Sequence, residues 1–244
     1  HELKENDIVE ARIDFIEDDD IVPEKMDLDI LYEDEYLLAI NKLPGIVVHP
    51  SSYHPNGTLA NGVKYYLNNK RKIRPINRLD RDTSGVVLFA KNEYIQERFV
   101  SLKVDKEYIA IVDGSPSTIT GTISAKIARK EGSIMERCVS EAGQEAITHY
   151  KVEKEEYLEE RPISILKVFL ETGRTHQIRV HFSHIGHPLI GDSLYGNELS
   201  NDVHEINRQA LHAHKLIFTH PILNKSIEIE AKLPEDIKKL GKCD

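Results

Sequence analysis

Short runs of apolar and β-branched residues, separated by polar turns, recur along most of this chain. Residues 86–90 are all apolar, and residues 163–170 are apolar at all but two positions, which is typical of buried strands. The same pattern predicts strands near residues 28–32, 36–41, 86–91, 106–112, 119–127, 145–153, 163–171, 213–219 and 225–231. Helices are predicted near residues 58–68, 93–101, 176–186 and 234–240.

The order of these elements indicates the fold class. Many predicted strands follow one another through short turns, for example at Val112-Asp113-Gly114 and at Glu155-Glu156, and few are separated by a crossover helix. We therefore expect an α+β fold with a largely antiparallel or mixed central sheet, flanked by helices and loops. The chain has no glycine-rich phosphate loop of either common type, which argues against a doubly wound nucleotide-binding fold.

Chain length and local composition predict one main domain. The 244 residues, 40% of them hydrophobic, can bury the core of one large domain with a small appendage. The N-terminal end differs from the rest, because Asn6-Asp7 predicts a turn, residues 8–13 alternate as a strand, and residues 17–20 form an acidic run. We expect residues 1–20 to be an N-terminal remnant plus an acidic linker, and residues 21–244 to be the main domain.

The sequence contains no apolar run long enough to cross a bilayer and no signal-peptide pattern. Its two cysteines, Cys138 and Cys243, are too few for a disulfide framework, and neither lies in a motif. We therefore expect a cytoplasmic protein without a membrane partner.

The formal net charge of −9 argues, on composition alone, against a partner as acidic as nucleic acid. The charges are unevenly distributed, however, with acidic residues gathered at residues 17–20 and 153–160. A basic tract leads toward residue 81 and consists of Lys64, Lys70, Arg71, Lys72, Arg74, Arg78 and Arg81. Such a tract can follow phosphates, although a solvated helix end is the alternative interpretation.

Residues 77–85 combine charged and turn-forming side chains directly before the apolar run at residue 86. A carboxylate at a junction between a loop and a strand is held by the sheet and yet open to a ligand. Asp80 is therefore a candidate reactive group. Two alternatives remain: Asp80 and Asp82 could chelate a divalent ion, or they could solvate a turn with nearby arginines as surface partners.

A second cluster of functional side chains occupies residues 171–181, at the end of the predicted strand 163–171. Ile178, Phe182 and Ile185 follow helical spacing, so one side of the predicted helix can pack inward while Arg179 and the histidines occupy the others.

The two clusters occur together in one known family. Residues 78–85, 173–181 and 186–192 closely resemble motifs of the RluA/RluD-type RNA pseudouridine synthases. The resemblance covers residues 27–240 in family order and includes residues 31–42, 45–50, 57–61, 106–110, 211–214 and 220–221. Asn77 departs from the pattern, since the family usually has His there. Residues 1–20 resemble the tail of the small RNA-binding S4 module that many relatives carry.

The resemblance implies a pseudouridine synthase catalytic domain that isomerises specific uridines in structured RNA, either rRNA or tRNA. Because the sequence has no obvious apolar stripe, we expect a monomer. The reaction detaches uracil from its sugar, turns it over and rejoins it through C5. No atoms are gained or lost, so we expect no cofactor and no metal.

The resemblance also implies roles for individual residues. It assigns the catalytic carboxylate to Asp80, the paired guanidinium to Arg179, and the ring against which uracil stacks to Tyr108. Asp80 could attack C1′, add to C6 or abstract a sugar proton, and each route needs it ionised, as an adjacent guanidinium favours. Three arginines are implied as RNA contacts: Arg78 in the gap left by an everted base, and Arg81 and Arg174 at phosphates.

Two other functions fit parts of the pattern. The chain could be an RNA-binding or assembly factor without turnover, although such a protein has no chemical need for Asp80, Tyr108 and Arg179 together. It could also hydrolyse RNA with a metal held by Asp80, Asp82 and histidines. The spacing of His176, His181, His184, His187, His212 and His214 gives no single coordinating face, however. We expect instead that these histidines form hydrogen bonds on an RNA-facing surface.

Overall fold

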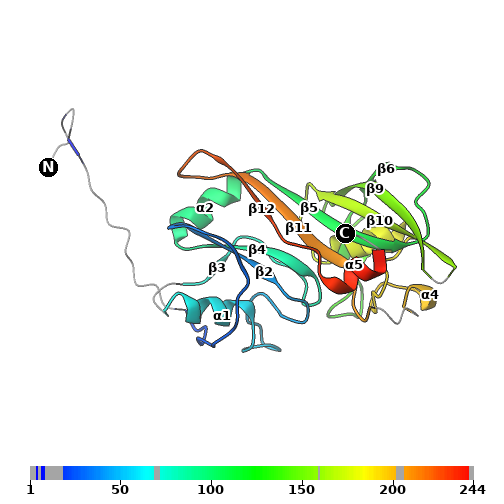
Figure 1. Cartoon of the computed structure of the whole chain (residues 1–244), viewed down its shortest axis with the longest axis horizontal. Helices are drawn as coiled ribbons and strands as arrows, with labels where there is room; N and C mark the ends of the chain where they lie inside the picture. Colours follow the sequence, from blue (N-terminus) through cyan, green and yellow to red (C-terminus); the bar gives the residue numbers. More distant parts are fainter. Residues whose placement is uncertain are drawn as a thin grey trace.

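A computed structural model of the protein describes residues 4, 7–8, 19–68, 72–158, 160–201 and 206–241. In these ranges, ten strands form one sheet in the order β1-β2-β4-β11-β5-β10-β9-β6, with β12 beside β11 and β3 beside β4 (Figure 1). The strands are β1 Ile30–Glu33, β2 Leu37–Lys42, β3 Arg74–Pro75, β4 Ser84–Ala90, β5 Val104–Asp113, β6 Thr120–Ser124, β9 Ile147–Leu158, β10 Arg161–Leu170, β11 Leu211–Thr219 and β12 Ser226–Glu230. A separate hairpin joins β7 Ile127–Arg129 to β8 Arg137–Val139.

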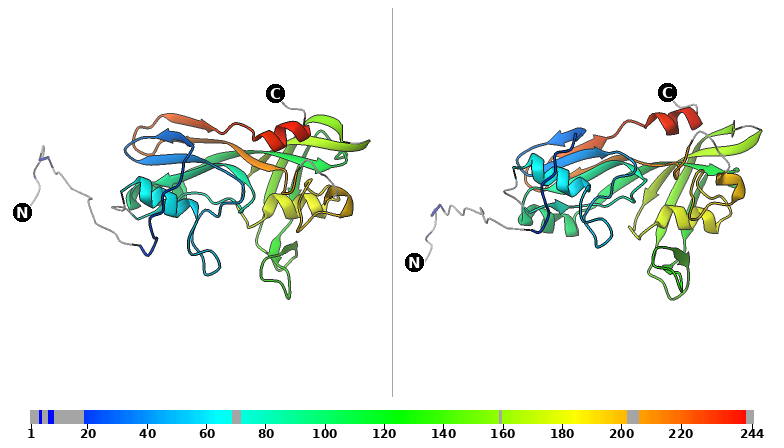
Figure 2. Two further views of the ribbon diagram at one scale, coloured as in Figure 1. Left: turned by 60° about the horizontal axis from the view of Figure 1, so that its bottom comes forward. Right: turned by 90° about the horizontal axis from the view of Figure 1, so that it is seen from below.

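The helices are α1 Leu59–Tyr66, α2 Glu93–Ser101, α3 Gln177–His184, α4 Glu198–Asn201 and α5 Glu235–Gly241. In the described ranges, no helix is both long and apolar enough to span a membrane. Figure 2 shows that α3 and α5 lie on opposite faces of the sheet, and that the β7–β8 hairpin extends away from it.

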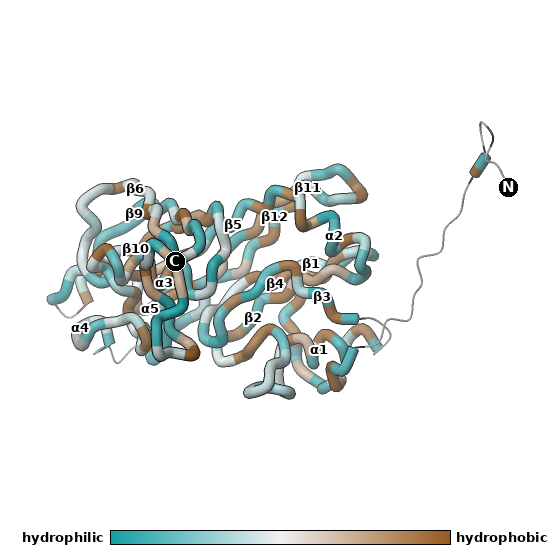
Figure 3. The backbone as a smooth tube through the Cα atoms, turned by 180° about the vertical axis from the view of Figure 1, so that it is seen from behind, coloured by the Kyte–Doolittle hydropathy of each residue, from teal (hydrophilic) through white to brown (hydrophobic). Residues whose placement is uncertain are grey.

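The sheet has a hydrophobic core on each face, because successive side chains of a strand point to opposite faces. In β2 and β4, Leu38 and Val87 belong to the cluster that α1 covers, whereas their neighbours Leu37 and Val86 belong to the cluster that α2 covers. Brown, hydrophobic segments in Figure 3 recur along the strands of the sheet.

The other half of the sheet follows the same rule. Tyr108, Ala110 and Val112 on β5 pack on the side of α3, and the intervening Ile109 and Ile111 pack on the side of α5. The partly buried side chain of Leu79 contacts both the α1 cluster and the α3 cluster, so these two helices lie on the same face.

Gly85 makes the junction between the two halves possible. Most strand pairs in the sheet are antiparallel, but β4 and β11 pair in parallel at Gly85 and Ala213. A Cβ atom at Gly85, whose φ is 115°, would lie 2.1 Å from the carbonyl oxygen of Ala213. Only glycine therefore permits the close approach of these two strands.

The α+β class and the largely antiparallel, mixed sheet are confirmed, and every strand and helix predicted between residues 28 and 240 has a counterpart near its expected position. Strand β3, the β7–β8 hairpin and α4 were not predicted. The turn predicted at Glu155-Glu156 is wrong, because both residues pair with β10 and the strand continues to Leu158. Except for residue 8, the strand predicted at residues 8–13 lies outside the described residues, as do Cys243 and residues 17–18 of the acidic run.

Candidate active site

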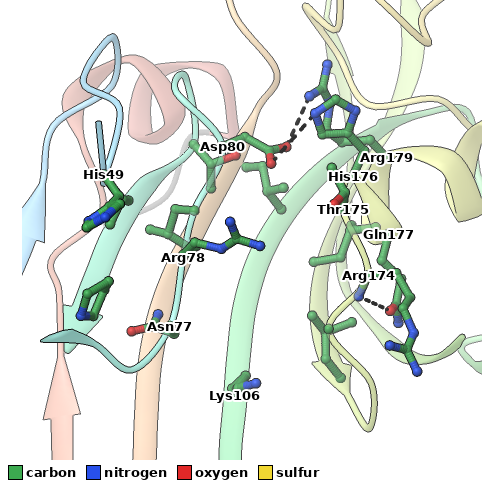
Figure 4. A pocket seen from close by; sticks show the side chains of 18 of the residues that line it. His49, Asn77, Arg78, Asp80, Lys106, Arg174, Thr175, His176, Gln177 and Arg179 are labelled. Atoms are coloured by element: carbon green, nitrogen blue, oxygen red, sulfur yellow. Dashed lines mark hydrogen bonds and ion pairs between the residues drawn. The ribbon is translucent and has the colours of Figure 1, made fainter. Parts of the chain in front are cut away.

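A cleft of about 590 Å³ opens between the α1 half and the α3 half of the molecule (Figure 4). Five parts of the chain line it: residues 47–51 after β2, residues 75–80 and Thr83 before β4, Lys106 and Tyr108 on β5, Leu170 at the end of β10 with residues 173–179 after it, and Leu211 on β11. The cleft therefore joins the two motif clusters, which are far apart in the sequence.

Asp80 and Arg179 meet at one end of this cleft. The Nη1 atom of Arg179 donates a hydrogen bond of 3.0 Å to Oδ2 of Asp80, whose side chain is 24% exposed. Asp80 comes from the loop that precedes β4, and Arg179 comes from the first turn of α3. The carboxylate is thus paired on one side and open to the cleft on the other.

Arg179 is itself fixed from behind by Asp192. The Nε and Nη2 atoms of the arginine donate hydrogen bonds of 2.7 and 2.8 Å to the two carboxylate oxygens of Asp192, which is fully buried. Oδ1 of Asp192 also accepts hydrogen bonds from the backbone N–H groups of Leu194 and Tyr195. The forked geometry fixes the plane of the guanidinium and therefore the direction from which it meets Asp80.

The electrostatics keep Arg179 charged. Burial disfavours its charge, but hydrogen bonds with Asp192 and the negative charges of Asp192 and Asp80 outweigh burial and raise its pKa. The guanidinium carbon also lies 5.0 Å from the centre of the Tyr195 ring, a further favourable contact for a cation.

His176 forms the third side of this arrangement. It has a left-handed backbone conformation, with φ 58°, directly before α3, and its Nε2 lies 3.8 Å from Oδ1 of Asp80. Its Nδ1 is 2.7 Å from the hydroxyl of Tyr195. Burial lowers the pKa of His176, against the opposing charge of Asp80, so the neutral imidazole is favoured at neutral pH.

Gln177 positions the loop that carries His176. Its Oε1 accepts hydrogen bonds from the backbone N–H of Arg174 and the hydroxyl of Thr172, and its Nε2 donates to the carbonyl of Ile147 and the hydroxyl of Thr148. This buried amide connects the start of α3 to β9, a role that was not predicted from the sequence.

Tyr108 lies in the same cleft, on β5, with 8% of its surface exposed. Burial raises the pKa of its phenol, and the negative charge of Asp80 raises it further. The phenol therefore stays protonated at neutral pH.

The three arginines expected to contact RNA differ in position. Arg78 is exposed and its side chain extends into the cleft (Figure 4). Arg174 also lines the cleft, and its Nε donates to the carbonyl of Glu145. Arg81 lies on the surface outside the cleft lining, where it forms hydrogen bonds of 3.0 to 3.2 Å with Asp82.

The loop that carries Asp80 is held from beneath by buried polar groups. The ammonium of Lys42 donates hydrogen bonds to the carbonyls of Arg81 and Leu43, at 2.8 and 2.9 Å. Arg208 donates through Nη1 to the carbonyl of Asp82, and its Nε and Nη2 pair with Asp236 of α5. Neither cation was predicted as part of the site, because no residue pattern reveals which backbone carbonyls a side chain will bind.

Lys42 is fully buried, and its environment changes its ionisation. Burial lowers its pKa from 10.5 to about 7, while the charge of Asp82 opposes that change. Lys42 therefore titrates near physiological pH directly beneath the loop of Asp80.

The expected basic tract is only partly a surface feature. Lys64 is 1% exposed because its ammonium pairs with Asp19 at 2.6 Å, and Arg74 is also buried. Lys70 and Arg71 lie outside the described residues. Lys64 and Arg74 therefore stabilise the fold and are not available to phosphates. The same pairing shows that the expected acidic linker packs, at Asp19, on the main domain.

The expectation for the six histidines holds only in part, because His176 lines the cleft and His184 is exposed, whereas two others are buried. His181 and His212 are fully buried, where they bond to Thr148 and the carbonyl of Ala125, and to Ser84 and the carbonyl of Ala231. No group of three or more His, Cys, Asp and Glu side chains with metal-binding geometry occurs among the described residues.

Asn77, which stands where the family usually has His, has a structural role. Its side-chain amide donates to the carbonyl of Val86 and accepts from the backbone N–H of Leu88, at 3.0 and 2.8 Å. The amide thus imitates a backbone group and extends the pairing of β3 along β4 to the start of the Asp80 loop.

Comparison with known proteins agrees with this geometry. The sequence profile of the family described as "RNA pseudouridylate synthase" matches residues 36–184. The chain is 41% identical to the uncharacterized RNA pseudouridine synthase YjbO of Bacillus subtilis, over 98% of this chain and 85% of the relative. It is 40% identical to the ribosomal large subunit pseudouridine synthase D of Xylella fastidiosa, over 91% and 70%.

A solved structure agrees as well. Human RNA Pseudouridylate Synthase Domain Containing 1 is 26% identical and superposes with a TM-score of 0.70, over 89% of this chain and 87% of the human chain. The profile covers more than half of the chain, and the relatives match over most of its length. The chain therefore belongs to the RNA pseudouridylate synthase family.

Proposed function

We propose that Asp80 initiates the conversion of uridine to pseudouridine in structured RNA, with Arg179 and Tyr108 as its partners. The chain is an RNA pseudouridine synthase by family, and the ion pair between Asp80 and Arg179 is the observation that supports these roles. The carboxylate lies in an open cleft, and its cationic partner is fixed by Asp192.

The reaction breaks the bond between N1 of uracil and C1′ of ribose and forms a bond between C5 and C1′. The C5 proton is lost and N1 gains a proton, so the substrate and product have the same composition. Asp80 can act by attack on C1′, by addition to C6 or by removal of a sugar proton. In each route the cleft must hold the detached uracil while it turns over.

Tyr108 is proposed to hold the uracil and to lie near the C5 proton. Stacking of a base on an aromatic ring contributes about 1–3 kcal/mol. Its raised pKa keeps the phenol protonated, so the hydroxyl can donate a hydrogen bond to the base or relay a proton.

A uridine stacked within RNA cannot reach Asp80, so the nucleotide must turn out of the stack, at a cost of a few kcal/mol. Arg78 is proposed to occupy the space that the base leaves, because its side chain extends into the cleft beside Asp80 (Figure 4). Arg174 is proposed to contact a phosphate along the wall of the cleft. Arg81, outside the cleft, is proposed to contact RNA farther from the target nucleotide.

The relatives named for the ribosomal large subunit make rRNA of that subunit the first substrate to test, with tRNA as the second. We further propose that the enzyme acts in the cytoplasm, as a monomer, on RNA without a cofactor. Residues 1–20 are proposed to be the end of an S4-like RNA-binding module with its linker, which precedes the catalytic domain of residues 21–244.

The function can be tested with purified protein and bulk RNA from cells that lack the gene. We expect the wild-type protein to form pseudouridine at specific positions in the presence of a chelator, as mapped by chemical probing and sequencing. Asp80→Asn should abolish conversion while RNA binding is largely kept, because the substitution removes the charge and preserves the size of the side chain.

Two outcomes would reject the proposal in different ways. RNA binding without conversion by the wild-type protein would indicate a binding or assembly factor. Chelator-sensitive strand scission that needs both Asp80 and Asp82 would indicate a metal-dependent hydrolase. Asp105→Asn, which removes an exposed carboxylate outside the cleft, is the matched control and should leave conversion unchanged.

A further inference from the structure

Lys106 is a cation in the cleft that the proposed mechanism does not use. It lies on β5 two residues before Tyr108, and side chains two apart on a strand share a face. Both residues line the cleft on the side of α3. Figure 4 places Lys106 at the end of the cleft away from Asp80 and Arg179.

Lys106 has no partner among the described residues. Burial lowers its pKa, and no carboxylate is close enough to oppose that change. The other buried cations of the site are all satisfied, since Arg179 binds two carboxylates and Lys42 binds two carbonyl oxygens. Lys106 is therefore partly buried and carries a charge that the protein does not compensate.

A buried charge without a partner destabilises the free protein, and such groups gather at sites that bind ligands. The ligand that would compensate Lys106 must be anionic. In RNA, uracil and ribose are neutral and the backbone phosphates carry the charge. We propose that Lys106 binds a backbone phosphate of the RNA strand that brings the everted nucleotide into the cleft. This inference rests on the proposed function.

The side of Lys106 that faces the cleft is bordered by Gly173. The facing wall is formed at Gly173, where a Cβ atom would lie 3.9 Å from Nζ of Lys106. Because Gly173 has no side chain, nothing from that position covers the ammonium, and both residues line the cleft. Tyr108 lies about 6.8 Å farther along the strand, so the base can stack there while Lys106 binds an adjacent phosphate.

The first experiment measures the salt dependence of binding to a fluorescent 15-nucleotide oligouridylate, for which base identity is constant. Each phosphate contact to a single strand contributes about 0.7 to the slope of log K against log salt concentration. We expect Lys106→Gln to weaken binding roughly tenfold at low salt and to reduce the slope by about 0.7, whereas Lys106→Arg keeps the slope. Lys103→Gln is the matched control, because Lys103 is exposed outside the cleft, and it should keep the slope.

A second pair of variants leaves Lys106 in place. Gly173→Asp puts a carboxylate beside the ammonium and should reduce the slope as Lys106→Gln does. Gly173→Asn has nearly the same size without the charge and should keep the slope. This pair decides the question even if Lys106→Gln does not fold. An unchanged slope in both charge-altering variants would overturn the proposal, as would equal losses in Gly173→Asp and Gly173→Asn.

Steady-state kinetics of Lys106→Gln distinguish phosphate binding by Lys106 from a role in the chemical step. In bulk RNA labelled with tritium at C5 of uridine, Lys106→Gln should raise KM roughly tenfold and leave kcat within about twofold of the wild type. A fall in kcat with unchanged KM would overturn the phosphate assignment. Failure of the wild-type protein to release tritium would instead reject the proposed function, and the oligouridylate experiment would still decide the role of Lys106.

Discussion

Asp192 holds the guanidinium of Arg179 with two hydrogen bonds, of 2.7 Å to Nε and 2.8 Å to Nη2, and leaves Nη1 to meet Asp80. The buried Asp192 compensates the charge of Arg179. Arg179 in turn orients the partly exposed Asp80 and favours its ionised form. This division predicts that the two aspartates contribute differently to stability and to catalysis.

Asp192→Asn should destabilise the protein by about 3 kcal/mol, because it leaves the buried guanidinium with only the partly exposed Asp80 as an ionic partner. Asp80→Asn should cost much less, since Asp80 is partly exposed and Arg179 keeps Asp192. Urea denaturation at pH 7 measures both changes in the free energy of unfolding. Equal losses from the two substitutions would contradict this division.

Arg179→Lys keeps a positive charge but cannot bridge both carboxylates with fixed geometry. We expect kcat to fall roughly 100-fold, since a displacement of about 1 Å in a catalytic group has effects of that size. RNA affinity, measured by filter binding, should stay within about twofold. Arg98→Lys, in the last turn of α2, is the control for the same exchange and should leave kcat unchanged.

Tyr108→Phe removes the phenol but keeps the ring. If the hydroxyl takes part in removing the C5 proton, tritium release should slow roughly 100-fold while RNA affinity is unchanged, because stacking remains. Tyr150→Phe removes a hydroxyl from the same core cluster outside the cleft lining, and it should not change the rate. A parallel loss of affinity and rate in Tyr108→Phe would show that the hydroxyl acts in binding.

Lys42 should make stability depend on pH. Its pKa is about 7 in the folded protein and 10.5 ordinarily, so between these values the unfolded chain binds more protons than the folded one. The free energy of unfolding should therefore rise with pH across this window, by up to about 1.4 kcal/mol per pH unit from this group. Below pH 7 the full penalty of a buried ammonium is present.

Lys42→Met removes the titrating group, so its stability should rise less steeply between pH 7 and 9 than that of the wild type. Urea denaturation at three pH values in this range measures the two slopes. Parallel slopes would mean that Lys42 stays charged in the folded protein.

Asp236 of α5 should support catalysis from a distance. It pairs with Arg208, which donates to the carbonyl of Asp82 in the loop of Asp80. Asp236→Asn should loosen this loop and lower kcat roughly tenfold, with KM unchanged. Its neighbour Glu235 is exposed and, within the described part of the chain, pairs only with Lys238 of α5, so Glu235→Gln should have no effect. If the two variants have the same kcat, Asp236 does not support the Asp80 loop through Arg208.

The sequence predicts strands well where apolar residues form a continuous run. Strands such as β2 and β4 bury apolar side chains on both faces, and their apolar runs are unmistakable. The β7–β8 hairpin escaped prediction because each strand has three residues and no side chain pattern distinguishes Ile127–Arg129 from a loop. The false turn at residues 155–156 has the opposite cause, since charged residues on an exposed strand resemble a turn.

The site was only partly predictable. Asp80 and Arg179 lie 99 positions apart, and their contact follows from a family motif and not from periodicity. The burial of Lys64 depends on Asp19, 45 positions away, which is why a basic run was interpreted as a surface. Lys42 and Arg208 bind backbone carbonyls, and only the folded chain reveals which ones.

The tight contact at Gly85 determines how this enzyme can recognise its substrate. Because β4, β11 and β5 run as adjacent strands beneath both walls of the cleft, the two halves share one continuous sheet, which restricts closure of one half over the other. The energy of turning the nucleotide out of its stack then becomes an important part of the cost of binding. Uridines in bulges, loops and other weakly stacked positions should be preferred over those in a regular duplex, because their eversion requires the least energy.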